Sequence, residues 1–222
     1  MEAETKKSVI HAIMEKKVIA IFRGIAPEKV PYAADALSCG GVPIMEITFD
    51  QKEERAGFRT TIEGIRKLSQ MGRAILVGAG TVLSPQQVVL AYNAGAKFII
   101  TPTMDPEVIQ LANSLGMVTM PGAYTPTEIN NAYKVGADFV KVFPASEAGP
   151  SYFKALQGPL GHIRLTAVGG VGLENAADFL KAGAVGLGIG GSLVNRKLIE
   201  AGDYAGLREL AGKFSERVRC VK

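Results

Sequence analysis

Two ionisable residues, Lys141 and Glu46, occur inside stretches that otherwise predict buried β-strands. Lys141 lies within residues 137–144, where the central positions are apolar and favour β-structure. Burial strips water from a lysine ammonium and lowers its pKa, so that a neutral amine becomes available near neutral pH. Such an amine can attack a ketone and form a Schiff base. The alternative is a lysine at a strand end that pairs with a carboxylate or extends into solvent.

Glu46 is the second ionisable residue within an apolar run, Ile44-Met45-Glu46-Ile47. Burial raises the pKa of a carboxyl group, which suits a group that must both accept and donate a proton. The alternative is a structural carboxylate that pairs with Arg23 or Lys141. A lysine and a glutamate on two separate buried strands favour catalysis over structural pairing.

The segments around these residues alternate between strand and helix along the whole chain. We expect helices at residues 3–15, 27–37, 53–70, 85–93, 106–115, 126–135, 152–156 and 174–181, and further helices up to the C-terminus. Strands are expected at residues 18–22, 42–48, 74–77, 97–100, 117–120, 138–142, 163–168 and 184–187. Three helices end in a similar phrase with glycine as the left-handed terminator: Asn93-Ala94-Gly95-Ala96, Lys134-Val135-Gly136-Ala137 and Lys181-Ala182-Gly183-Ala184.

Eight predicted strands separated by helices favour a closed parallel barrel. The predicted fold class is therefore α/β, a single-domain (β/α)8 TIM barrel over residues 1–222 with an extra N-terminal helix. The alternative is a doubly wound open sheet, which usually carries GxGxxG after its first strand. Here Phe22 is followed by Arg23-Gly24-Ile25-Ala26-Pro27 instead, and no linker divides the chain.

A barrel places its catalytic groups at the carboxyl ends of its strands, and this chain collects polar residues and glycines there. The glycines that end the last two strands, at 169–170 and 190–191, can bind phosphate through backbone amides and a helix N-terminus. They can also simply form tight turns. Gly78-Ala79-Gly80-Thr81 is either a turn and helix cap or a carboxylate site to which the Thr81 hydroxyl donates.

Composition excludes several classes of function. The formal charge of +4 over 222 residues comes without basic runs interleaved with aromatics, so we expect no nucleic-acid partner. Cys39 and Cys220 lack CxxC spacing, which favours a reducing compartment, and His11 and His162 have no neighbouring metal-ligand types. Residues 1–17 lack the apolar block of a signal peptide, and no spanning segment follows. We expect a cytoplasmic protein with no membrane partner and no metal.

At this point the residues resemble the family of class I 2-keto-3-deoxy-6-phosphogluconate (KDPG) aldolases, which also contains 4-hydroxy-2-oxoglutarate (KHG) and 2-keto-3-deoxy-6-phosphogalactonate aldolases. The resemblance covers essentially the whole chain, and its phrases occur in the family's order. They are Glu46-Ile47-Thr48-Phe49, Val77-Gly78-Ala79-Gly80-Thr81-Val82-Leu83, Pro121-Gly122, Lys141-Val142-Phe143-Pro144-Ala145, Gly169-Gly170-Val171 and Gly190-Gly191-Ser192.

The resemblance implies a role for each matching position. Lys141 is implied as the Schiff-base lysine and Glu46 as the general acid and base. The substrate carboxylate is implied at Thr81 with the backbone of Gly80, and the phosphate at Gly169, Gly170, Gly191 and Ser192. The implied substrate pocket contains Thr48, Pro102, Pro121, Phe143 and Val168. The family is homotrimeric and needs neither metal nor cofactor, so the same is implied here.

Two positions depart from the family's pattern. Many relatives carry an arginine shortly after the Glu-x-Thr phrase to bind the substrate carboxylate, where this chain has Phe49-Asp50. Arg23, at the end of the first strand, resembles the alternative placement of that arginine in other relatives. Val168 stands where many phosphogluconate aldolases have a threonine, which can hydrogen-bond a sugar hydroxyl. The galacto-type enzymes look similar to this chain at that position.

The implied reaction is cleavage of KDPG, a phosphorylated 2-keto-3-deoxy acid, to pyruvate and glyceraldehyde 3-phosphate. The same site could also cleave KHG to pyruvate and glyoxylate, and the phosphogalactonate aldolase is the alternative within the family. A phosphate-binding barrel isomerase or epimerase would use Glu46 as a base and Lys141 as an electrostatic partner. A non-catalytic sugar-phosphate-binding barrel is the alternative from another class.

Overall fold

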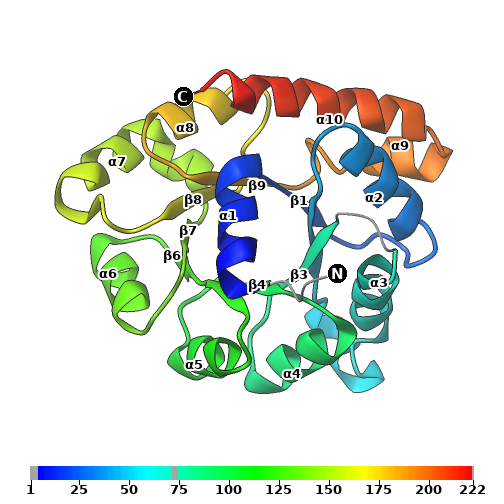
Figure 1. Cartoon of the computed structure of the whole chain (residues 1–222), viewed down its shortest axis with the longest axis horizontal. Helices are drawn as coiled ribbons and strands as arrows, with labels where there is room; N and C mark the ends of the chain where they lie inside the picture. Colours follow the sequence, from blue (N-terminus) through cyan, green and yellow to red (C-terminus); the bar gives the residue numbers. More distant parts are fainter. Residues whose placement is uncertain (1–4, 72–74, 222) are drawn as a thin grey trace.

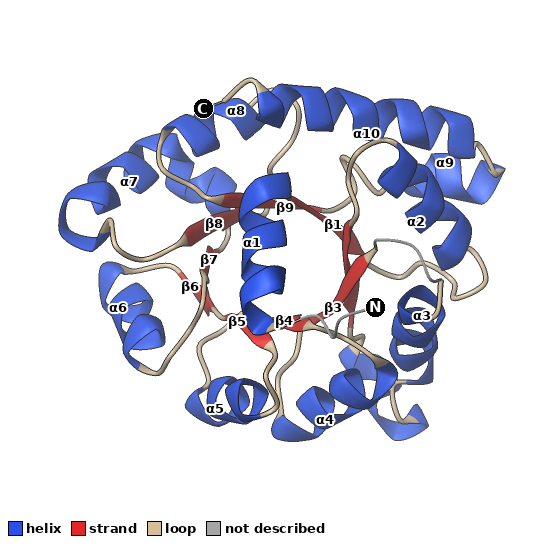
Figure 2. Cartoon of the chain, viewed as in Figure 1, coloured by secondary structure: helices blue, strands red, loops and turns tan. Residues whose placement is uncertain are grey.

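A computed structural model of the chain describes residues 5–71 and 75–221, and its strands form a parallel barrel. The nine strands that it describes follow the order β5-β4-β3-β2-β1-β9-β8-β7-β6. Their bounds are β1 Val18–Phe22, β2 Ile44–Thr48, β3 Leu76–Gly80, β4 Phe98–Ile100, β5 Val118–Met120, β6 Gly122–Ala123, β7 Val140–Val142, β8 Leu165–Val168 and β9 Gly186–Ile189. Figure 2 shows them as a ring inside the helices.

The barrel closes at its fifth stave, which is divided into β5 and β6 on either side of Pro121. β5 pairs with β4, and β6 pairs with β7. The backbone N–H of Phe139 also donates to the carbonyl of Thr119 at 3.1 Å, and that of Lys141 donates to Pro121 at 2.8 Å. The nine strands therefore make eight staves, and the predicted (β/α)8 barrel is confirmed.

Helices surround the barrel, and one further helix crosses its mouth (Figure 1). The surrounding helices, with one 3-10 helix η1, are α2 Val30–Cys39, η1 Gln51–Ala56, α3 Arg59–Ser69, α4 Pro85–Ala94, α5 Pro106–Ser114, α6 Pro126–Lys134, α7 Ala145–Leu160, α8 Ala176–Lys181, α9 Arg196–Ala201 and α10 Tyr204–Arg219. The crossing helix is α1, Lys6–Lys16, the predicted extra N-terminal helix. No helix in the described ranges is long and apolar enough to cross a membrane.

Apolar side chains fill the barrel interior at the amino-terminal ends of the strands. Val9 and Ile13 of α1 are buried against side chains at or near the starts of the strands, among them Ile19, Ile44 and Phe98. A separate, larger apolar layer lies between the strands and the surrounding helices. Because α1 and these side chains close the amino-terminal mouth, open space inside the barrel remains at the carboxyl ends of the strands.

The predicted glycine terminators are confirmed in all three helices. Gly95, Gly136 and Gly183 have φ angles of 103°, 101° and 103°, a conformation that costs glycine little. The N–H of the residue after each glycine donates to a carbonyl five residues earlier: Ala96 to Ala91, Ala137 to Ala132 and Ala184 to Phe179. This bonding satisfies the last carbonyls of the helix and turns the chain into the next strand.

Most predicted elements are present with their bounds shifted by one to three residues, and the short strand β6 was not predicted; three segments differ more. The single helix expected at 53–70 is divided, because Gly57 and Phe58 adopt φ angles of 70° and 55° between η1 and α3. β3 continues to Gly80, although the strand was expected to end at residue 77. α7 spans 16 residues with a kink at Gly149, where only 152–156 had been expected. Residues 3, 4 and 74 of the predicted elements, and residues 1, 2, 72, 73 and 222 of the predicted domain, lie outside the described ranges.

Candidate active site

A cavity of about 740 Å³ lies at the carboxyl ends of the strands, within the size range of small-molecule sites. Most of the predicted site residues line it together, although they are far apart in the sequence. They are Arg23, Glu46, Thr81, Pro102, Lys141, Phe143, Val168, Gly169, Gly170, Gly191 and Ser192. The remaining lining residues are Ile21, Val171, Gly172, Gly188 and Gly190.

Lys141 is the central residue of β7 and only 6% of it is exposed. Its backbone N–H is held by the carbonyl of Pro121, and it is in register with Thr166 of β8. The Nζ atom lies 4.7 Å from the centroid of the Phe143 ring. Burial lowers the pKa of Lys141 below its ordinary value; Glu46 opposes this effect and Arg23 adds to it. The neutral amine required for attack on a ketone is therefore easier to form here than in water.

Glu46 is the central residue of β2 and is 1% exposed. Its Oε2 atom is buried and has no hydrogen-bond partner within the described ranges. Burial raises its pKa from 4.5 to about 6, against the opposing influence of Lys141 and Arg23. A carboxyl group with this pKa can accept and donate a proton near neutral pH.

Lys141 and Glu46 lie on the sixth and second staves, which are on opposite sides of an eight-stave barrel. Within the described part of the chain, Glu46 forms no ion pair with Lys141 or Arg23. The structural salt bridge that the sequence left open is therefore not what holds Glu46 in place. Both side chains face the same cavity, where a bound keto acid could contact them together.

Two glycines of β3 make room for the neighbouring side chains. A Cβ atom at Gly80 would overlap the carboxylate of Glu46, and one at Gly78 would overlap the Phe98 ring. Gly80 pairs with Thr48 in the β2–β3 register, so it sits beside the end of the strand that carries Glu46. Residues 78–80 are thus strand residues, and the predicted turn begins only at Thr81. Glycine inside a strand marks such close approaches.

Arg23 and Thr81 meet at the rim of the cavity. Arg23 Nη2 donates to Thr81 Oγ1 at 3.2 Å, which leaves the rest of the guanidinium group for other acceptors. Phe49 and Asp50, which depart from the pattern of the resembling family, have structural roles here. Phe49 is buried against Phe58, with ring centroids 5.1 Å apart, and the Asp50 side chain accepts from the N–H of Lys52 to cap η1.

The glycine loops after β8 and β9 form another part of the cavity wall. Gly169 and Gly170 have φ angles of 93° and 71°, and a Cβ at Gly170 would overlap the Ser146 side chain. A Cβ at Gly191 would meet no atom within 4 Å, so this backbone is open to a ligand. Ser192 Oγ donates to the carbonyl of Val171 at 2.8 Å and connects the two loops.

Three predicted pocket residues do not line the cavity. The Thr48 hydroxyl donates to the Phe22 carbonyl at 3.1 Å and so joins the ends of β1 and β2. Pro121 is buried and holds the backbone of Lys141, while Gly80 gives space to Glu46. Direct contact with a substrate remains a prediction for each of these three residues.

Several lining or supporting residues were missed by the sequence analysis. Ile21 of β1 lines the cavity and lies two residues before Arg23, which directly follows the strand, a spacing that the alternation of β1 could have revealed. Asn175 holds the loop after β8: its Oδ1 accepts from Gly172 N at 2.9 Å, and its Nδ2 donates to the Gly170 carbonyl at 3.0 Å. Nothing in the local sequence separates Asn175 from an ordinary helix cap.

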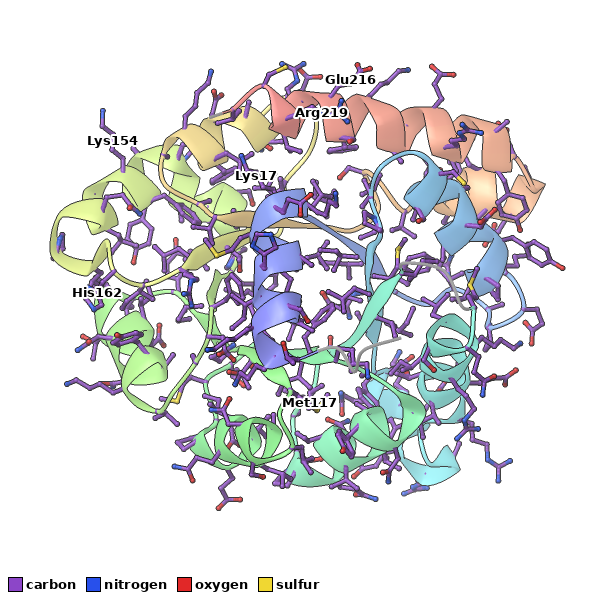
Figure 3. All side chains as sticks on the ribbon, viewed as in Figure 1. Lys17, Met117, Lys154, His162, Glu216 and Arg219 are labelled. Carbon is purple, nitrogen blue, oxygen red and sulfur yellow. The ribbon has the colours of Figure 1, made fainter. Side chains whose placement is uncertain are left out.

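Another hollow, of about 530 Å³, lies between the end of α2 and α10. Its charged residues, including Arg208, Glu216 and Arg219, are exposed. Figure 3 labels the last two on α10, outside the barrel. This hollow contains neither Lys141 nor Glu46, and none of the predicted site residues lines it.

Comparison with known proteins agrees with this site. The family model described as KDPG and KHG aldolase matches residues 9–210. A probable 2-dehydro-3-deoxy-6-phosphogalactonate aldolase of Rhizobium meliloti is 39% identical over 81% of this chain and 82% of its own length. The 2-dehydro-3-deoxy-phosphogluconate aldolase of Haemophilus influenzae is 33% identical over 90% of this chain and 92% of its own.

A solved structure described as native KDPGal is 35% identical, has a TM-score of 0.80 and covers 91% of this chain and 94% of that chain. The family model, which matches residues 9–210, extends through all the staves that bring Lys141 and Glu46 to one cavity. A family model that covers most of the chain, relatives above 30% identity and the same barrel lead to one conclusion. The chain belongs to the KDPG and KHG aldolase family, a family of carbon-carbon lyases.

Proposed function

We propose that this protein is a class I aldolase that cleaves KDPG to pyruvate and glyceraldehyde 3-phosphate through a Schiff base on Lys141. The observation that carries the proposal is the joint position of two buried groups. The amine of Lys141 has a lowered pKa, the carboxyl of Glu46 has a pKa raised to about 6, and both line one cavity. The first group suits nucleophilic attack and the second suits proton transfer.

The reaction begins when the neutral Nζ of Lys141 attacks the C2 ketone. Glu46 donates and accepts protons while the carbinolamine forms and loses water, which leaves an iminium ion. The C4 hydroxyl then loses its proton, the C3–C4 bond breaks, and the iminium nitrogen accepts the electron pair. Glyceraldehyde 3-phosphate departs, and the enamine is protonated at C3. Hydrolysis of the resulting iminium releases pyruvate and restores the lysine.

The rest of the cavity suits the two charged ends of the substrate. Arg23 and the Thr81 hydroxyl at one rim would bind the carboxylate of the pyruvate half, beside the backbone of Gly80. The glycine loops with Gly169, Gly170, Gly191 and Ser192 would bind the phosphate through backbone amides. Phe143, next to Lys141, would pack beside the imine.

The phosphogalactonate epimer is a second candidate, and Val168 is the observation that favours it. Val168 lines the cavity with an apolar side chain that cannot hydrogen-bond a sugar hydroxyl. Relatives named for the galacto substrate are 39% and 37% identical to this chain. Both epimers give the same two products, so the proposed chemistry is common to them. From the family resemblance we also propose a homotrimer that works in the cytoplasm.

The proposal is tested by measuring pyruvate release with a coupled lactate dehydrogenase assay. The substrates are the gluco acid, the galacto acid and KHG. We expect release from at least one of the two phosphorylated acids, and the ratio of their kcat/KM values then decides the C4 preference. If neither acid yields pyruvate, while the protein interconverts sugar phosphates, the isomerase alternative replaces this proposal. Ligand-induced stabilisation without turnover would favour a binding protein instead.

A further inference from the structure

A series of side-chain hydrogen bonds runs from a buried position on α4 to the rim of the cavity. Gln87, in the first turn of α4, is only 2% exposed. Its Oε1 accepts from the backbone N–H of Leu83 at 2.5 Å, and its Nε2 donates to Gln51 Oε1 at 2.8 Å. Gln51 Nε2 in turn donates to the carbonyl of Thr81 at 2.9 Å. Thr81 is the residue to which Arg23 donates.

The direction of these bonds is fixed by groups that can act in one way only. The backbone N–H of Leu83 is a donor, so it must face the oxygen of the Gln87 amide. The NH2 group of Gln87 then faces Gln51 and selects the oxygen of that amide. The NH2 group of Gln51 is left to face the Thr81 carbonyl, which is an acceptor. Each amide is therefore held in a single orientation.

The series ends at Thr81, whose backbone conformation needs support from its surroundings. Thr81 has a φ of 56°, in the left-handed region that β-branched residues rarely occupy. Such a conformation persists where the surrounding structure fixes it, and it is common at ligand-binding sites. Here the Thr81 carbonyl is fixed by Gln51, the next N–H, of Val82, donates to Ile100 at 3.3 Å, and the Leu83 N–H is fixed by Gln87.

We propose that Gln51 and Gln87 are positioning residues for carboxylate binding. They hold Thr81 in its left-handed conformation, and thereby set the place of its hydroxyl and of the Arg23 guanidinium at the rim. This inference rests on the proposed function, because it assigns the pair to the carboxylate of the pyruvate half. Neither glutamine lines the cavity, so both act through Thr81 rather than on the substrate.

The local sequence places Gln51 within reach of Thr81. The Asp50 side chain caps η1, and Gln51 is the first residue of that helix. The arginine at the rim here is Arg23, which comes from β1 and reaches the site through a bond to Thr81.

The test uses neutral substitutions, so that no new charge acts on the substrate. Gln51→Met and Gln87→Met keep side-chain length and remove the hydrogen bonds, and Gln86→Met is the matched control. Gln86 is exposed and neighbours Gln87 on α4. Each variant is reduced with borohydride at increasing pyruvate concentration, and trapping at Lys141 is followed by intact mass. Steady-state kcat and KM are measured on the better of the two phosphorylated acids.

We expect the pyruvate concentration that gives half-maximal trapping to rise about tenfold in both test variants, which equals about 1.4 kcal/mol of binding. Trapping at saturating pyruvate and kcat stay within about twofold of wild type, and the control is unchanged. Because Gln51 is exposed, its variant is expected to fold even if Gln87→Met does not. In a Thr81→Gly background, where a positive φ costs little, Gln51→Met should lose its effect.

Unchanged half-saturation in Gln51→Met would overturn the assignment, and so would an equal loss in kcat with no change in KM. An equally large effect of Gln51→Met in the Thr81→Gly background would show that the pair does not act through the Thr81 backbone. If wild-type protein is not trapped by pyruvate at all, the proposed function fails instead. The two failures are thus separate observations.

Discussion

Replacing Gly80 with alanine should displace the carboxylate of Glu46, the proposed acid and base, without changing its chemistry. The new Cβ would lie 2.7 Å from Glu46 Cγ and closer still to the carboxyl carbon and Oε1. Gly80 is paired with Thr48 of β2 on one side and with Ile100 of β4 on the other, so its backbone cannot yield. The Glu46 side chain must therefore move away from its present place between β2 and the cavity.

The size of the effect follows from that displacement. Restoring an ordinary contact requires a movement of about 1 Å, and a misplacement of about 1 Å in an active site can cost roughly 100-fold in rate. Overpacking of this kind costs roughly 1–3 kcal/mol of stability. For a chain of this length each kcal/mol lowers Tm by about 2–4 °C. We expect a kcat about 100-fold below wild type in a protein that still folds.

The assay is kcat for pyruvate release together with exchange of the pyruvate methyl protons in D2O, which reports proton transfer on the enamine. Gly212→Ala is the matched control, because its Cβ would meet no atom within 4 Å. Adding Glu46→Asp to Gly80→Ala removes one methylene from the crowded position and should restore Tm but not kcat. Wild-type exchange and turnover in Gly80→Ala would refute the reasoning that the position of Glu46 matters.

Two further predictions concern the same cavity. The folded-state pKa of Glu46, about 6, lies above its ordinary 4.5, so the folded protein binds more protons between these values and loses stability as pH rises through 6. This rise in pKa corresponds to about 2 kcal/mol of stability. In urea unfolding, the free energy of unfolding of Glu46→Gln relative to wild type should therefore increase by that amount between about pH 4 and about pH 7.5. A difference that does not change with pH would contradict the burial argument. Gly191→Ala should leave Tm and pyruvate trapping unchanged but raise KM for the phosphorylated substrate about tenfold, equal to about 1.4 kcal/mol, because its Cβ enters open space in the loop. An unchanged KM would remove Gly191 from the phosphate site.

The barrel could be predicted from sequence because its local signals agree with one another. Each apolar run is followed by a helix, and the glycine terminators at 95, 136 and 183 mark where one unit ends and the next begins. Lys141 and Glu46 could be identified because a charged residue inside an apolar strand is costly and therefore conspicuous. Both are in fact buried at the centres of their strands.

The parts that could not be predicted depend on contacts between distant segments. Gly80 looked like a turn residue, and only the packing of Glu46 explains glycine within β3. The division of the fifth stave at Pro121 follows from the different pairing of its two halves with β4 and β7. Nothing in the sequence indicated that Gln51 and Gln87 interact, because two polar residues 36 positions apart meet only in the folded chain.

The most direct test of the account is borohydride reduction of the protein with pyruvate, followed by proteolysis and mass mapping. We predict one pyruvate-derived adduct, on the peptide that contains Lys141, and none in Lys141→Met. An adduct on another lysine, or no adduct at saturating pyruvate, would contradict the claim that the buried amine of β7 forms the Schiff base.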